Sequence, residues 1–170
     1  MKPKILIVDD EAIIRDFISE VLIRMGHAPL AADSGEKAIT HLERTEFDVV
    51  ITDFKMPGIS GIEVLKRALD LCPDCRVIII TAFGTIEHAV EAMKMGAHDY
   101  ITKPISPDQL EMIVSKALEY KKLKTGNRRL RDEVSDEFSY ENIIGKAANM
   151  QAVFELIRRA SPSDSTILIN

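Results

Sequence analysis

Three aspartates are the residues of this chain best suited to chemistry. Asp9 and Asp10 directly follow the apolar run Ile5–Val8, and Asp53 directly follows a second apolar run. Carboxylates that converge repel one another, which raises at least one pKa unless a cation offsets the charge. A hard divalent cation resolves this repulsion, and a small all-oxygen ligand set suits Mg²⁺, for which Mn²⁺ could substitute.

Two further side chains could act at the same place. Thr81 ends a later apolar run, and Lys103 follows another and precedes Pro104. With a cation present, Asp53 could attack phosphorus while Thr81 and Lys103 hold the phosphoryl oxygens; positioning and electrostatics supply most of phosphoryl-transfer catalysis. The product would be an aspartyl phosphate.

Alternating strands and helices could position these residues. The expected strands are Ile5–Val8, His27–Ala32, Phe47–Thr52, Val77–Thr81 and Tyr100–Thr102. Helical apolar spacing lies between them and after the last one. Asp33 with Glu36 indicates an N-cap, and Ser106 with Pro107 marks the start of a fifth helix. Short connections between such elements predict an α/β fold with a parallel sheet covered on both faces.

The carboxyl ends of parallel strands are where such sheets bind ligands. Asp9 and Asp10, Asp53, Thr81 and Lys103 all follow or end predicted strands. We therefore expect them on one rim of the sheet.

The motifs at these strand ends resemble those of the receiver domain of two-component response regulators. They are Ile5–Glu11, Asp53–Gly58, Thr81-Ala82 and Lys103-Pro104, and the resemblance covers roughly residues 3 to 120. It implies a flavodoxin-like, doubly wound five-stranded parallel sheet in the order 2-1-3-4-5. It also implies a phosphorylation switch, in which Asp53 accepts a phosphoryl group from a sensor histidine kinase.

The resemblance also assigns the metal ligands. Asp10 and Asp53 would bind Mg²⁺ directly, Asp9 would act through a coordinated water, and Lys55 would contribute its backbone carbonyl. The domain would catalyse its own phosphorylation and dephosphorylation with Mg²⁺, without being an enzyme that turns over a substrate.

Three further residues acquire expected roles from the same resemblance. Thr81 would move toward the phosphoryl group, and Tyr100 would turn into the space that it leaves. The peptide bond before Pro104 is expected to be cis, which X-Pro bonds reach cheaply.

The sequence changes character after residue 120, so we expect a receiver domain at 1–120 and a helical linker at 121–137. Ile113, Tyr120, Asn127 and Val134 recur at seven-residue intervals, which predicts a short coiled coil. Gly126 interrupts this pattern and leaves open a helix with a flexible joint. We expect a homodimer formed by the fourth helix, fifth strand, fifth helix and linker.

Residues 138–170 resemble the opening of the AAA+ ATPase domain of sigma-54-dependent, NtrC-type transcription activators. The likeness is clearest in Ile144-Gly145, Met150-Gln151 and Phe154 through Ile169. The chain contains neither a G-x-x-x-x-G-K phosphate loop nor a helix-turn-helix. We therefore expect an N-terminal fragment whose contacts with sigma-54 RNA polymerase and DNA would be made by further domains.

Composition excludes some other classes. The formal charge of −5 gives no electrostatic drive toward nucleic acid or anionic membranes. No signal peptide or membrane-spanning apolar run is visible, so a cytoplasmic protein without membrane contacts is expected. Cys72-Pro73-Asp74-Cys75 lacks a second cysteine pair, and the four histidines follow no metal-ligand spacing.

Two other functions fit the motifs less well. A phosphatase of the haloacid-dehalogenase type needs a second acid two residues after its nucleophile, where this chain has Lys55. A purely structural dimerisation module with a degenerate site is disfavoured because no acid is missing. Since Lys55 has no carboxylate or amide to orient water, we predict a slowly hydrolysing aspartyl phosphate.

Overall fold

The computed structural model describes residues 2–82, 86–120, 153 and 155. The chain divides into two compact units, Met1–Thr125 and Gly126–Asn170. Val153 and Glu155 of the second unit lie in helical conformation.

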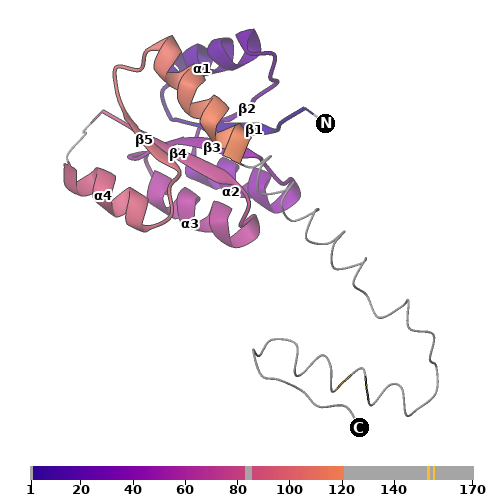
Figure 1. The fold of residues 1–170 in the computed structure, drawn as a ribbon. Helices are drawn as coiled ribbons and strands as arrows, with labels where there is room; N and C mark the ends of the chain where they lie inside the picture. The colour runs from indigo at the N-terminus through magenta and orange to yellow at the C-terminus, as the bar shows by residue number, and fades with distance from the viewer. Residues whose placement is uncertain (1, 83–85, 121–152, 154, 156–170) are drawn as a thin grey trace. The chain divides into compact units, whose positions relative to one another are not determined.

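Five strands alternate with helices along the first unit (Figure 1). The strands are β1 (Ile5–Val8), β2 (Leu30–Ala32), β3 (Val49–Asp53), β4 (Arg76–Thr81) and β5 (Asp99–Thr102). The helices are α1 (Ala12–Arg24), α2 (Gly35–Arg44), α3 (Gly61–Leu71) and α4 (Ile86–Lys94). A further helix, orange in Figure 1, occupies residues 107–120. All strand pairs are parallel in the order β2-β1-β3-β4-β5, which confirms the predicted topology.

Helices cover both faces of this sheet, as Figure 1 shows. Successive side chains of β1 alternate between two cores, because a strand directs its side chains to opposite faces. Ile5 and Ile7 pack with residues of α1 and of the 107–120 helix. Leu6 and Val8 pack with residues of α2, α3 and α4. All four β1 side chains are buried, which is why the strand is a continuous apolar run.

The cap of α2 differs from the prediction. Ser34, not Asp33, is the N-cap, and its side chain accepts a hydrogen bond from the Lys37 backbone N–H at 3.4 Å. Ser34 directly precedes the first helical residue, so its oxygen can reach the free N–H groups of the first turn. Asp33 lies one residue too early and pairs with the Lys37 ammonium at 2.7 Å instead.

Two other helices begin at serine caps. Ser60 and Glu63 form a reciprocal capping box at α3, which was not predicted. Ser106 accepts a hydrogen bond from the Gln109 backbone at 3.2 Å, which confirms the predicted start of the fifth helix.

The seven-residue series begins inside the domain core. Ile113 is buried against the sheet, so at that position the series faces its own domain. Tyr120 lies against the domain as well, with the Arg76 guanidinium 4.1 Å from its ring centroid. The predicted linker at 121–137 and ATPase segment at 138–170 fall outside the described residues, apart from Val153 and Glu155. Within the described ranges, no helix combines the length and apolarity needed to cross a membrane.

Candidate functional site

The register of the sheet aligns the candidate residues along one rim. Val8 pairs with Thr52, so the residues that follow them, Asp9 and Asp53, come to the same level. On the other side, Asp53 pairs with Ile80, the residue before Thr81. β3 begins two residues later than predicted and ends one residue later, so it includes Asp53, whose backbone is therefore held by the sheet itself.

Three carboxylates converge at this rim. Asp9, Asp10 and Asp53 each place one oxygen so that the three oxygens lie within 4.8 Å of one another. Asp9 and Asp53 are buried, whereas Asp10 is exposed at the mouth of the site. The predicted acid cluster therefore exists in the folded chain.

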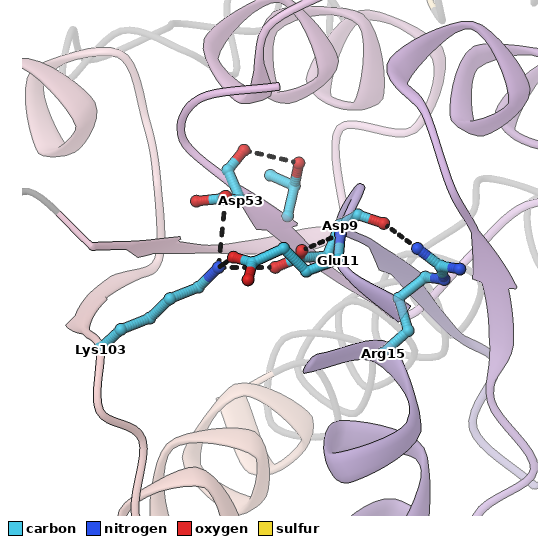
Figure 2. A network of polar contacts seen from close by, with 6 residues as sticks. Asp9, Glu11, Arg15, Asp53 and Lys103 are labelled. Atoms are coloured by element: carbon cyan, nitrogen blue, oxygen red, sulfur yellow. Dashed lines mark hydrogen bonds and ion pairs between the residues drawn. The ribbon is translucent and has the colours of Figure 1, made fainter. Parts of the chain in front are cut away.

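Lys103 directly follows β5, and its side chain reaches into the acid cluster. Its Nζ lies 3.0 Å from Asp9 Oδ2, 3.3 Å from Asp53 Oδ2 and 3.0 Å from Glu11 Oε1 (Figure 2). Its backbone N–H donates to the Thr81 carbonyl at 2.7 Å, which extends the β4–β5 ladder by one bond. Lys103 is thus fixed at both ends: the sheet holds its backbone, and three carboxylates hold its ammonium group.

The start of α1 is fastened to Asp9. The Glu11 backbone N–H donates to Asp9 Oδ1 at 2.8 Å, and the Arg15 guanidinium donates to the Asp9 carbonyl at 2.7 Å. Figure 2 shows both contacts beside the lysine network. Glu11 is the N-cap residue of α1, but its side chain makes no cap bond and turns to Lys103 instead.

Burial governs the protonation of the acids. Desolvation raises the pKa of Asp9, although the Glu11 backbone and Lys103 donate hydrogen bonds that lower it. Desolvation also raises the pKa of Asp53; the charge of Lys103 lowers it in part and that of Asp9 raises it further. Burial alone would lower the pKa of Lys103, but its bonds to Glu11 and Asp9 hold it above the ordinary value. One ammonium therefore pairs with three acids, and a further cation would relieve the repulsion among the carboxylates of the site.

The donor set fits a hard divalent cation. Asp9, Asp10 and Asp53 offer carboxylate oxygens within a span that one ion can bridge. Oxygen ligands of this kind suit Mg²⁺ and Mn²⁺, which complete their coordination with waters or phosphate oxygens. Lys55, whose carbonyl was the fourth expected ligand, follows β3 by two residues and has an exposed side chain.

Thr81 and Tyr100 occupy neighbouring strands. Thr81 is buried at the end of β4. Tyr100 pairs with Ile79, which lies two residues before Thr81 in β4. Because side chains alternate along a strand, Thr81 and Tyr100 belong to the same sheet face. The Tyr100 hydroxyl is buried and has no hydrogen-bond partner among the described residues. The Lys103–Pro104 peptide bond is cis, the isomer that was expected.

Glu11 and Arg15 belong to the network but were absent from the predicted site. Glu11 adjoins Asp9 and Asp10 in the sequence, so an acid next to the pair was the available signal. Nothing in the sequence pointed to Arg15, because its hydrogen bond to the Asp9 backbone carbonyl depends on how α1 directs its side chain toward the end of β1.

Comparison with known proteins identifies the family to which this fold belongs. A family model described as the response regulator receiver domain matches residues 5–115, the segment that carries all these strands and the acid cluster. The chain belongs to the response regulator receiver domain family. The resemblance drawn from the motifs is thereby confirmed.

Relatives of the receiver domain match almost the whole chain. This chain is 35% identical over 166 residues to the alginate biosynthesis transcriptional regulatory protein AlgB of Pseudomonas aeruginosa. The match covers 98% of this chain and 36% of that protein. This chain is 32% identical over 167 residues to the regulatory protein AtoC of Escherichia coli, covering 98% and 36%. The chain thus spans about a third of the length of these curated relatives.

Solved structures share the receiver fold. A response regulator receiver domain protein from Clostridium thermocellum is similar with a TM-score of 0.67 and 36% identity, over 71% of this chain and 98% of that one. NtrX from Brucella abortus is similar with a TM-score of 0.73 and 30% identity, over 97% of this chain and 36% of that one. The predicted fold class is confirmed for the receiver domain.

Proposed function

We propose that this receiver domain is a phosphorylation switch whose phosphoacceptor is Asp53. The observation that carries the proposal is the meeting of Asp9, Asp10 and Asp53 within 4.8 Å, with the Lys103 ammonium 3.3 Å from Asp53. The donor would be the phosphohistidine of a sensor histidine kinase, as is typical of the family.

Several residues of this chain would each have a separate role in phosphoryl transfer. An Asp53 oxygen attacks phosphorus, and the bond to the donor's imidazole nitrogen breaks, with its electron pair leaving on that nitrogen. Lys103, freed from part of its contact with Asp53, then faces a phosphoryl oxygen, and Thr81 is close enough in the sheet to donate a hydrogen bond to another. Mg²⁺ bound by Asp10, Asp53 and the Lys55 carbonyl, with Asp9 acting through a water, would offset the negative charge of the transferred group.

The output would be a change in packing at one surface. Movement of Thr81 toward the phosphoryl group would let Tyr100 turn inward. Tyr100 lies in β5, between α4 and the 107–120 helix, and both helices expose large apolar side chains. These are Val90, Met93 and Met112. We propose that phosphorylation changes homodimer packing along this surface and the linker.

The intact protein would use this switch to control a sigma-54-dependent transcription activator. The similarity to AlgB and AtoC supports this, because it extends over 98% of the chain and so beyond the receiver segment at 5–115. The ATPase, sigma-54 and DNA contacts would belong to domains beyond residue 170.

Intact mass measurement tests the phosphoacceptor directly. Incubation with acetyl phosphate and Mg²⁺ should add one phosphoryl group to the wild-type chain and none to Asp53→Ala. Asp70→Asn, which neutralises an exposed acid of α3, should be phosphorylated like wild type. Chelation with EDTA should abolish the reaction.

Equal phosphorylation of Asp53→Ala would refute the proposal. Steady release of phosphate from a generic phosphomonoester would favour the phosphatase instead. The dimer claim is separate: sedimentation and solution scattering should change with phosphodonor and Mg²⁺, and unchanged profiles would refute it.

A further inference from the structure

The loop that follows Asp53 is closed at its base. Residues 54–60 leave β3 and return to the start of α3, and the Gly61 backbone N–H donates to the Phe54 carbonyl at 3.1 Å. A Cβ on Gly61 would collide with the Asp53 backbone carbonyl, so the start of α3 touches the end of β3. The loop carries Lys55, whose position is therefore set by how the rest of the loop is held.

The tip of this loop is held by α2. Glu36 Oε1 accepts a hydrogen bond from the Ile59 backbone N–H at 3.2 Å. Gly58 adopts φ +75°, and a Cβ there would collide with the same Glu36 oxygen. A Cβ on Gly35 would lie 2.5 Å from the Ile59 carbonyl oxygen. These contacts, two from the Glu36 carboxylate and one from Gly35, bring the first turn of α2 directly against the loop tip.

The glycines explain why the contact is so close. Gly58 supplies a left-handed backbone that other residues rarely adopt, and its lack of a side chain leaves room for the Glu36 carboxylate. Gly35 lets the α2 backbone approach Ile59 without a side chain between them. An acid in the first turn of a helix also interacts favourably with the helix dipole, but that role alone would not require the carboxylate to face Ile59.

We propose that Glu36 is a positioning residue for the metal site. Its hydrogen bond to Ile59 holds the 54–60 loop in the conformation that presents the Lys55 carbonyl to the cation. This inference rests on the proposed function, in which that carbonyl is a ligand. Groups that support metal ligands from behind affect affinity although they never touch the metal.

Two variants separate the hydrogen bond from the charge. Glu36→Gln removes the charge but keeps an oxygen at the same reach, so it should retain Mg²⁺ affinity within about twofold. Glu36→Asp keeps the charge but is one methylene shorter, so it should lose the bond and raise the Mg²⁺ dissociation constant about three- to tenfold, the range that one net hydrogen bond supplies. Glu43→Ala is the matched control, because Glu43 lies on α2 but pairs with Arg67 of α3.

Isothermal titration of the full chain with Mg²⁺ alone gives these constants without phosphorylation. Urea unfolding in EDTA supplies a second readout, because a merely structural role would lower stability without a separate change in Mg²⁺ affinity. We expect wild type, Glu36→Gln and Glu43→Ala to bind Mg²⁺ with similar affinity, and Glu36→Asp to bind it more weakly.

Each other outcome overturns the inference. If Glu36→Asp binds Mg²⁺ like wild type, the bond to Ile59 does not position the site. If Glu36→Gln is as weak as Glu36→Asp, an acceptor oxygen at the reach of Glu36 is not sufficient to position it. These results leave the phosphoacceptor proposal intact as long as wild type binds Mg²⁺. A wild-type chain that does not bind Mg²⁺ would refute both.

Discussion

The ring of Phe54 stacks on the imidazole of His88, with centroids 4.8 Å apart and planes inclined by 29°. Phe54 directly follows Asp53, and its backbone N–H donates to the Ile80 carbonyl at 2.7 Å. His88 belongs to α4. This pair therefore joins the residue next to the phosphoacceptor to the helix at the proposed output surface.

We expect this stack to be energetically coupled. In a double-mutant cycle of Phe54→Leu and His88→Leu, the coupling free energy should be about 0.5–1.5 kcal/mol, as for other stacked aromatic pairs. Urea unfolding of wild type, both single variants and the double variant measures it. Additivity within about 0.3 kcal/mol would show that the rings touch without stabilising each other.

Neutralising the phosphoacceptor should stabilise the metal-free domain. Asp53→Asn removes a buried charge that faces Asp9, while Lys103 keeps its contacts with Asp9 and Glu11. The free energy of unfolding in EDTA should rise by about 1 kcal/mol, and the further gain with Mg²⁺ should be smaller than in wild type.

Asp70→Asn serves as the control for this change, because it removes an exposed acid far from the rim of the sheet. It should alter neither the stability in EDTA nor the effect of Mg²⁺. A destabilised Asp53→Asn would mean that its ion pair with Lys103 outweighs burial and repulsion.

The aspartyl phosphate should hydrolyse slowly because of Lys55. Its side chain is exposed two residues after Asp53 and provides no group that orients an attacking water. Lys55→Asn should shorten the lifetime roughly tenfold, less than a well-placed general base supplies. Intact mass followed over time after removal of the phosphodonor measures this, with Lys66→Asn of α3 as control. A wild-type lifetime of seconds would contradict the prediction.

Protonation of His98 should destabilise the domain. Burial lowers the pKa of this histidine, and the nearby Arg76 charge lowers it further, against a smaller opposite effect of Asp99. The unfolded chain therefore binds this proton at a higher pH than the folded one. The stability associated with neutral His98 is present above the unfolded pKa of about 6.5 and decreases as pH falls below it.

Urea unfolding between about pH 7.5 and pH 5.5 tests this prediction against His98→Gln. Wild type should lose stability relative to the variant as pH falls. Parallel curves would contradict the expectation, as would an imidazole pKa of 6.5 or higher measured by NMR in the folded protein.

Local patterns predicted the elements well where burial is extreme. Ile5–Val8 is apolar at every position because both faces of β1 are covered, and this pattern differs from that of a surface helix. Single-residue choices were less predictable. Asp33 and Ser34 are both common N-caps and stand side by side, and only the backbone path into α2 decides between them.

The predicted site was incomplete for a similar reason. Asp9, Asp10, Asp53, Thr81 and Lys103 stand at strand ends, and a parallel sheet brings such ends to one rim. Three other contacts cannot be predicted from the positions of strand ends. They join Glu11 to Lys103, Arg15 to the Asp9 carbonyl, and Glu36 to Ile59. They depend on the angles at which helices leave and approach the sheet.

The sequence by itself therefore determined the α/β architecture and which strand ends carry chemically competent side chains. Apolar periodicity and strand-end polarity are local properties, so they can be recognised in the sequence without knowing which segments come into contact. The tertiary structure alone decided which carboxylates share Lys103, which helix holds the loop after Asp53 and which aromatic ring reaches α4. Each of these is a contact between segments distant in the chain, and its existence depends on how closely the helices pack on the sheet.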